Sequence, residues 1–158
     1  MKQQGVTLIQ MMFTLGLAAL LTQLGMPAYA KLSDNLHRSA AARDLAHALR
    51  SARSHAMLQS QPVLVQPLEN DWGKGWRVML ESNHQLLREH RLARPMKIAS
   101  NIGEQVRFSA LGIPLTYANT FQSGTLEICD SHYHVVLAKT GRISLRTGER
   151  KNPLCAGQ

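Results

Sequence analysis

The feature that most constrains this sequence is an apolar stretch at its N-terminus. From residue 3 to residue 30 the only ionisable side chain is that of Tyr29. A helix rises about 1.5 Å per residue, so roughly 20 apolar residues cross the hydrocarbon core of a bilayer. We therefore expect residues 6–30 to form a transmembrane or fibre-core helix.

The residues before this stretch are few, and they end in a glycine. Lys2 is the only basic residue ahead of Gly5, and the apolar run follows Gly5 directly. In an ordinary secretory signal the apolar region lies between a basic start and a small-residue cleavage site, so that cleavage removes it. Cleavage after Gly5 would leave the apolar helix on the mature chain. This order of parts predicts an anchor, with residues 1–5 as a leader peptide.

The sequence Gly-Val-Thr-Leu-Ile at residues 5–9 resembles the class III signal of type IV pilins and type II secretion pseudopilins. The resemblance implies that a prepilin peptidase cuts after Gly5 and methylates the new N-terminal residue, Val6. The usual family motif is Gly-Phe-Thr-Leu-Ile-Glu, so Val6 and Gln10 are departures from it. The alternative interpretation is a plain single-pass anchor in which the match is accidental.

Gln10 is the departure with the larger physical consequence. In the family, the glutamate is expected to pair with the N-terminal ammonium of a neighbouring subunit inside the apolar fibre core, where an unpaired charge is costly. Gln10 can accept a hydrogen bond from an ammonium but cannot neutralise it. The position therefore predicts a minor subunit, near a fibre tip, rather than the bulk subunit.

Helical periodicity continues beyond Ala30 with a changed character. Apolar residues recur every three to five positions, with arginines on the other side, to about residue 59, and Pro62 ends the pattern. The sequence predicts one helix over about residues 6–60, with its second half packed on a sheet. Pro27 lies inside the apolar part and is expected to kink the helix.

Beyond Pro62, short β-like runs alternate with turn residues. The expected strands are residues 62–66, 76–80, 85–88, 96–99, 105–109, 125–129, 134–139 and 142–146, and residues 71–75 are expected to form a turn. We expect Trp76 in the core and Trp72 partly exposed. The implied fold class is α+β: a long N-terminal helix packed on antiparallel β-sheets.

Four segments extend the resemblance over nearly the whole chain. Gly-Trp-Arg-Val at 75–78 and the segments 106–112, 126–130 and 135–143 follow in the order seen in the GspH/FimT family of minor pilins and pseudopilins. The resemblance implies a type IV pilin-like fold, single-pass anchoring in a bacterial inner membrane, and a globular periplasmic or extracellular domain over residues 31–158. It also implies assembly with other pilins or pseudopilins into a pilus or pseudopilus.

A basic segment near the C-terminus is the candidate binding site. The formal net charge is +8, which favours polyanionic partners. Residues 139–151 carry five cations against the single acid Glu149, and these cations are Lys139, Arg142, Arg146, Arg150 and Lys151. On a strand, Arg142 and Arg146 would share one face about 13 Å apart. Two guanidiniums so spaced suit successive phosphates, and without interleaved aromatic residues any DNA binding should be led by phosphate contacts.

The FimT branch of the family carries a Gly-Arg-x-Arg motif in its C-terminal region and binds DNA during natural transformation. In this sequence Gly141 and Arg142 match, but Ser144 stands where the second arginine would be, and Arg146 lies two residues farther on the same face. The alternative is that Gly141 and Arg142 simply form a turn and a strand start, with the arginines as a solvated face. In that case the chain is a structural type II secretion pseudopilin without DNA binding.

The remaining chemistry of the sequence is limited. Cys129 and Cys155 fit one disulfide in an oxidising compartment, worth roughly 3–4 kcal/mol, that would hold the C-terminal tail to the sheet. His132 and His134 lie near Cys129, but zinc sites need three or four ligands with a recognisable spacing, so no metal site is expected. No phosphate-binding glycine loop or nucleophile motif is present, and we expect neither a cofactor nor an enzyme.

Overall fold

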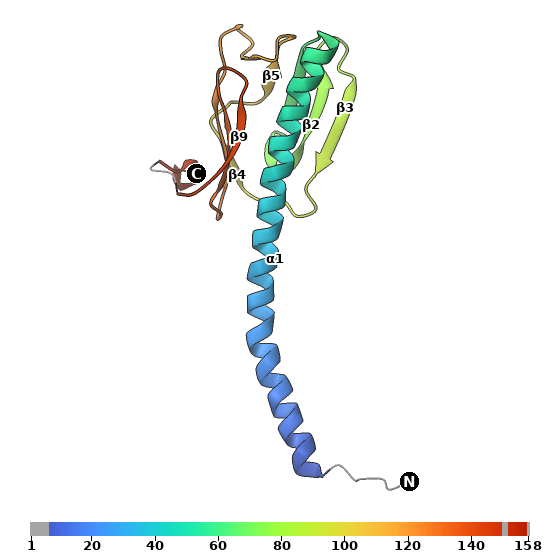
Figure 1. Ribbon diagram of the computed structural model, residues 1–158, viewed down its shortest axis with the longest axis vertical. Helices are drawn as coiled ribbons and strands as arrows, with labels where there is room; N and C mark the ends of the chain where they lie inside the picture. Colours follow the sequence, from blue (N-terminus) through green and yellow to red (C-terminus); the bar gives the residue numbers. More distant parts are fainter. Residues whose placement is uncertain (1–6, 150–151, 158) are drawn as a thin grey trace. The chain divides into compact units, whose positions relative to one another are not determined.

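The computed structural model describes residues 7–149 and 152–157. The chain divides into an N-terminal unit that ends at His37 and a compact unit that begins at Arg38, and helix α1 (Leu8–Gln59) has residues in both (Figure 1). The compact unit begins later than residue 31, where the globular domain was expected, and residues 34–37 are exposed. The expected processing residues Gly5 and Val6 lie outside the described residues.

The N-terminal unit is the first half of α1, with its apolar side chains exposed. Within the described residues, α1 is the one helix long and apolar enough to cross a membrane. Its hydroxyl groups are satisfied inside the helix, because Thr14 Oγ1 donates to the Met11 carbonyl at 2.9 Å and Thr22 Oγ1 donates to the Ala18 carbonyl at 2.6 Å. Such internal bonds remove the cost of placing these groups in apolar surroundings. The helix is continuous through Pro27, where the expected kink stays a prediction.

The part of α1 that belongs to the compact unit is buried over most of its circumference. The buried side chains are small or aliphatic: Ala41, Ala42, Leu45, Ala46, Ala48, Leu49, Ala52 and Ala56. The alanines allow strands to approach the helix closely from two directions. Only a narrow stripe of this segment stays exposed, and it contains Arg43, His47 and Arg50.

A left-handed residue ends α1. Ser60 has φ +51°, and the Gln61 N–H donates back to the Ala56 carbonyl at 3.2 Å. This bond closes a Schellman-type cap. Pro62 follows and has no N–H with which to continue the helix, so the end of α1 agrees with the sequence-based expectation.

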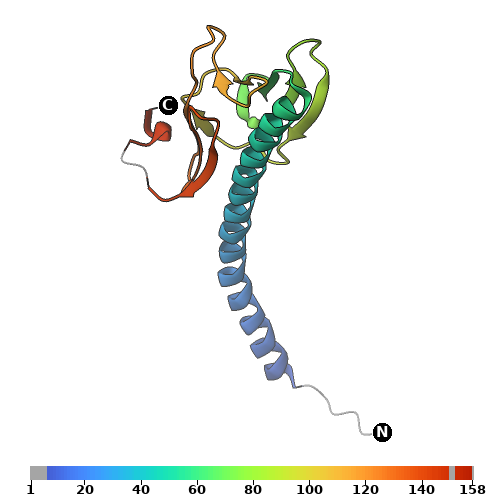
Figure 2. The same cartoon turned by 45° about the horizontal axis from the view of Figure 1, so that its top comes forward.

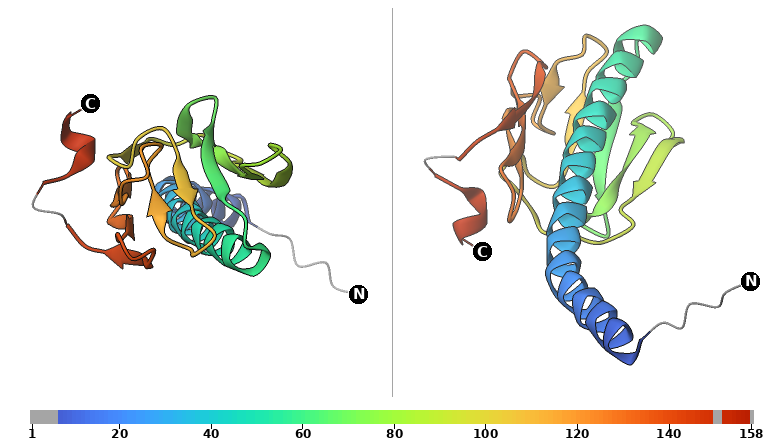
Figure 3. Two further views of the ribbon diagram at one scale, coloured as in Figure 1. Left: turned by 90° about the horizontal axis from the view of Figure 1, so that it is seen from above. Right: turned by 60° about the horizontal axis from the view of Figure 1, so that its bottom comes forward.

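Two antiparallel sheets enclose the helix. The first has the order β3 (Leu86–Arg91), β2 (Asp71–Leu80), β1 (Val63–Leu68), β5 (Val106–Phe108) and β6 (Pro114–Leu115). The second has the order β4 (Ile98–Ser100), β7 (Gly124–Ile128), β8 (Tyr133–Leu137) and β9 (Ile143–Thr147). Within the compact unit, β2 and β3 lie on one side of α1, and β4 and β9 lie on the other (Figures 1 and 3).

The turn expected at residues 71–75 is wrong, because these residues belong to β2. The chain reverses one step earlier, at Glu69 and Asn70, whose φ values are +52° and +60°, and Leu68 pairs with Asp71 across the turn. Positive φ at both central residues is typical of the type I′ turn that joins two adjacent strands. The Lys74 ammonium, 2.6 Å from the carboxylate of Glu69, holds the pKa of Glu69 below its usual value and raises the pKa of Lys74.

The extension of β2 also explains the position of Trp72. Trp76 is buried as expected, but Trp72 is buried as well rather than partly exposed. Both indoles belong to one core that combines α1 with side chains of both sheets, among them Phe108, Leu126 and Val135. The core therefore reaches farther along β2 than the glycine-rich sequence suggested.

Candidate nucleic-acid interface

The basic segment forms a tight β-hairpin between β8 and β9. The Gly141 N–H donates to the Ala138 carbonyl at 2.8 Å, and the Ala138 N–H donates to the Arg142 carbonyl at 2.9 Å. Gly141 has φ +80°, which is the glycine position of a three-residue hairpin loop. Lys139 and Thr140 are exposed at the tip, and Arg142 is exposed where the next strand begins.

Close packing of the backbone adds a second constraint on the glycine of this hairpin. A Cβ at Gly141 would lie 2.3 Å from the Gly112 carbonyl oxygen and 2.9 Å from Nε of Arg53. There is no room for a side chain. The glycine of the Gly-Arg pair is therefore explained by turn geometry and packing, whether or not the hairpin binds DNA.

Side chains alternate along β9 as the sequence pattern suggests. Ile143 is buried and Leu145 packs partly against the core, while Arg142 and Arg146 are exposed. Ser144 lies between the two arginines and carries no charge. The sheet thus presents Arg142 at the end of the hairpin and Arg146 farther down the strand.

Arg146 lies in a more mixed electrostatic environment than Arg142. It is paired with His134 on β8, and His134 is paired with Glu127 on β7. A hollow of about 560 Å³ on this face is lined by Thr125, His134, Val136, Arg146, Thr147, Gly148, Glu149 and Asn152. Carboxylates near Arg146 reduce its attraction for a phosphate, and Arg142 lines no part of this hollow.

Several acids elsewhere in the domain form ion pairs of their own. The pairs include Glu81 with Arg107, Glu89 with Arg91, and Asp130 with Arg38. Among the described residues, Lys139, Arg142 and Arg146 have no such acidic partner within 4.0 Å. Part of the excess positive charge therefore remains available on the hairpin. The other two candidate residues, Arg150 and Lys151, lie outside the described residues.

The C-terminal tail is fixed to the second sheet by a disulfide. Cys129 and Cys155 are joined with an S–S distance of 2.05 Å, and the Leu154 N–H donates to the Glu127 carboxylate at 2.7 Å. The tail includes a short helix, η1 (Leu154–Gly157), beside β4 and β7 (Figure 2). This agrees with the expected staple.

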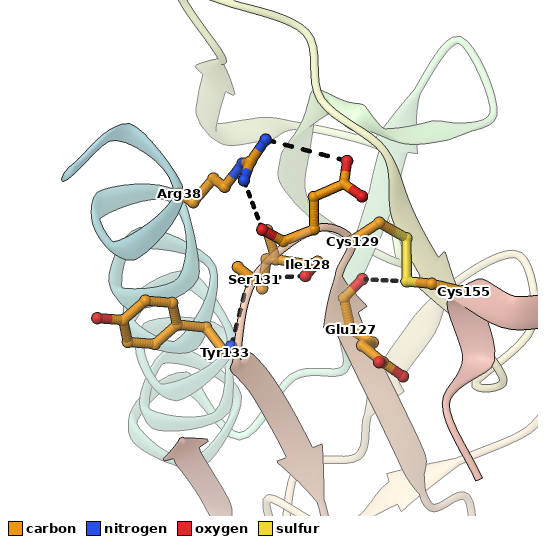
Figure 4. Close-up of polar contacts among 8 residues, drawn as sticks. Arg38, Glu127, Ile128, Cys129, Ser131, Tyr133 and Cys155 are labelled. Carbon is orange, nitrogen blue, oxygen red and sulfur yellow. Dashed lines mark hydrogen bonds and ion pairs between the residues drawn. A yellow bond between two sulfur atoms is a disulfide. The ribbon is translucent and has the colours of Figure 1, made fainter. Parts of the chain in front are cut away.

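The turn that carries Cys129 is held from the other side by α1. Arg38 donates to the Asp130 carbonyl, and its guanidinium lies 3.9 Å from the Asp130 carboxylate (Figure 4). Ser131 Oγ donates to the Ile128 carbonyl at 2.7 Å and accepts the Tyr133 N–H at 3.3 Å. The disulfide is therefore attached to a well-bonded turn.

The structure adds two arginines that the sequence did not connect with the hairpin. Arg50 on α1 donates from Nε and Nη2 to the Ile143 carbonyl at 3.4 and 3.3 Å. Arg53, one turn farther along α1, donates from Nε to the Gly112 carbonyl at 3.0 Å. Helical periodicity places both on the polar side of α1, but it does not show which strand lies next to them.

The described residues hold no group of three His, Cys, Asp or Glu side chains that could bind a metal ion. The only disulfide of the chain uses both of its cysteines, so neither is a thiolate ligand. The features that remain for binding are the exposed cations of the hairpin and of α1.

Comparisons with known proteins identify the fold and the family. Residues 41–141, more than half of the chain, match the family model described as type II transport protein GspH. No curated protein matches the chain. Two crystal structures of the type IV minor pilin FimU from Pseudomonas aeruginosa PAO1 are similar to it.

The first FimU structure, in space group P21, is 22% identical in sequence, with a TM-score of 0.59 over 73% of this chain and 92% of that chain. The second, in space group P65, is 26% identical, with a TM-score of 0.55 over 68% of this chain and 91% of that chain. These matches confirm the α+β, type IV pilin-like fold expected from the sequence. With its long apolar helix and its two antiparallel sheets, the chain belongs to the GspH/FimT family of minor pilins and pseudopilins.

Proposed function

We propose that this subunit enters a type IV pilus or a type II secretion pseudopilus and binds DNA through its β8–β9 hairpin during DNA uptake. The observation that carries the proposal is the pair Lys139 and Arg142. Both are exposed at the end of a hairpin whose loop geometry is set by backbone hydrogen bonds, and neither has an acidic partner among the described residues. A rigid loop loses little conformational entropy when it binds a phosphate backbone.

The maturation of the subunit follows from the same proposal. A prepilin peptidase removes residues 1–5 and methylates Val6, and residues 6–30 hold the protein in the inner membrane until it is extracted into the fibre. The exposed apolar surface of α1 supports this step, and the disulfide supports a periplasmic position of the domain. Mass spectrometry of membrane-extracted protein should find a chain that begins at methylated Val6. An intact Met1 would refute this part.

A titration with duplex DNA tests the binding itself. The full chain in non-ionic detergent micelles is mixed with a DNA duplex of mixed sequence at several salt concentrations. Replacing Arg142 and Arg146 together by Ala should weaken binding and reduce the slope of log K against log salt by up to about 1.8, because each lost phosphate contact removes about 0.9. An unchanged affinity and slope would show that the hairpin is not the site.

The second candidate function is that of a structural type II secretion pseudopilin that exports proteins and does not bind DNA. The description of the matched family as a type II transport protein favours it. Deletion of the gene distinguishes the two. Loss of secreted proteins from the medium with normal DNA uptake supports the second function, and loss of DNA uptake with normal secretion supports the first.

A further inference from the structure

The exposed stripe of α1 and the β8–β9 hairpin together form one basic surface, which we name the helix–hairpin surface and define by Arg43, Arg50, Lys139 and Arg142. We propose that this surface, rather than the hairpin alone, binds the phosphate backbone of duplex DNA, with Arg50 as the partner of Arg142. The inference rests on the proposed DNA binding and adds the helix residues to it.

Helix geometry puts Arg43 and Arg50 on one side of α1. They are seven residues apart, close to two turns, which corresponds to about 10 Å along the axis. Both are exposed, while Ala42, Ala46 and Leu49 between and beside them are buried. The two side chains therefore leave the domain in the same direction, and neither has an ion-pair partner among the described residues.

The contact between Arg50 and Ile143 joins this stripe to the hairpin. The Arg142 carbonyl faces β8, because it accepts the Ala138 N–H, so the next carbonyl, that of Ile143, faces away from β8 at the open edge of the sheet. Arg50 occupies that edge with Nε and Nη2. Its other N–H groups stay available, since a guanidinium has five. A positive charge is thereby held next to the backbone of the residue that follows Arg142.

Arg53 supports the same region from behind. Its Nε binds the Gly112 carbonyl and lies 2.9 Å from the point where a Cβ at Gly141 would be. The side chain of Arg53 is half-buried, so we assign it a positioning role with a contribution to the local positive potential. Arg50, Arg53 and Arg142 thus bring three guanidiniums to one end of the hairpin.

Arg146 is less suited to the role that Arg50 fills. It is linked by strand pairing to His134 and through it to Glu127, and it shares its hollow with Glu149. The side of the hairpin next to α1 carries no carboxylate in contact with Arg50 or Arg142. A polyanion that lies across the helix–hairpin surface meets cations spaced along both the helix and the strand.

The test is a set of single substitutions in the full chain, in non-ionic detergent micelles, titrated with a mixed-sequence DNA duplex over a range of salt concentrations. Arg43→Gln, Arg50→Gln and Arg142→Gln should each lower the affinity about five- to tenfold near 0.1 M salt and lower the salt slope by about 0.9. Arg146→Gln should have a smaller effect. The control removes Arg77 and Arg88, two exposed arginines of β2 and β3, and should leave the slope unchanged.

The outcomes separate the two proposals. Normal binding by Arg43→Gln and Arg50→Gln, with a loss in Arg142→Gln, overturns this inference and leaves the proposed function in place. A wild-type chain that does not bind the duplex overturns the proposed function. Equal losses in the control and in the α1 variants overturn the site, because net charge alone would then explain binding.

Two further measurements guard against misinterpretation. Arg43 has no recorded protein contact, so Arg43→Gln changes the charge without removing a stabilising bond, whereas the thermal unfolding of Arg50→Gln must be compared with that of Arg50→Lys. Vesicles of phosphatidylcholine with phosphatidylglycerol replace the duplex in a parallel titration. Binding to the vesicles that depends on Arg43 and Arg50, without binding to the duplex, identifies a lipid surface and overturns the inference.

Discussion

Arg53 donates a hydrogen bond from Nε to the carbonyl of Gly112 over 3.0 Å. This bond connects the last turns of α1 with the loop after β5, and the same carbonyl oxygen lies against the backbone of Gly141. Three segments that are distant in the sequence therefore meet at the base of the β8–β9 hairpin. Any side chain added there must displace the backbone or the guanidinium.

Gly141→Ala should destabilise the domain by about 3 kcal/mol or more, because it combines backbone strain at φ +80° with a contact 2.3 Å from a carbonyl oxygen. Urea unfolding measures the loss. Gly103→Ala is the matched control, since Gly103 has φ +94° and no atom within 4 Å of an added Cβ. It should cost only about 1 kcal/mol. Equal losses in the two variants would mean that the close approach at Gly141 relaxes without cost.

Removal of the disulfide should be a second large effect on stability. Replacing Cys129 and Cys155 by Ser frees a tail that is closed at a sequence separation of 26, and the expected loss is about 3–4 kcal/mol in urea unfolding. Addition of a thiol reductant to the wild type should reproduce the loss and should not affect the double variant. A wild type that is indifferent to the reductant would show that the bonds to Glu127 and Asp130 hold the tail without the disulfide.

The ion pair between Glu81 and Arg107 is expected to stabilise the first sheet. Arg107 Nε lies 2.8 and 2.9 Å from the two Glu81 oxygens, and the side chains are only 30% and 18% exposed for Glu81 and Arg107. Glu81→Gln should cost about 1–2 kcal/mol in urea unfolding. Glu89→Gln is the control, because its partner Arg91 is 67% exposed, and it should cost less than about 0.5 kcal/mol. A larger loss in the control would contradict the role of burial.

Much of this architecture could be predicted from local sequence patterns. The apolar periodicity of α1 and the alternation in β5, β7 and β9 depend on which side chains face the core, so these elements were confirmed. The turn at Glu69 and Asn70 was missed because its geometry requires positive φ, which glutamate seldom adopts, whereas the nearby glycines resembled a turn. In the structure Gly73 and Gly75 serve close backbone approach to neighbouring segments instead.

The composition of the basic surface could be predicted only in part. The alternation of Arg142 and Arg146 follows from strand geometry, and the hairpin from Gly141. The approach of Arg50 to Ile143 depends on how far α1 is shifted along the sheet, and no local pattern records that shift. Likewise the carboxylates near Arg146 come from β7 and from the segment after β9, which only strand pairing brings together.

Gln10 gives the last prediction, which concerns assembly. Gln10→Glu should increase the fraction of the subunit recovered in sheared fibres, because a carboxylate in the apolar fibre core can neutralise the ammonium of a neighbouring Val6, which an amide cannot do. Gln23→Glu is the matched control: Gln23 is also exposed on the apolar half of α1, but it lies more than three turns from the N-terminus of the processed chain. It should lower the recovered fraction, since its new charge has no partner. If both variants behave like the wild type, recruitment of this subunit does not depend on charge neutralisation at its N-terminus. If Gln10→Glu reduces recovery, the glutamine itself is the group that the neighbouring subunits accept.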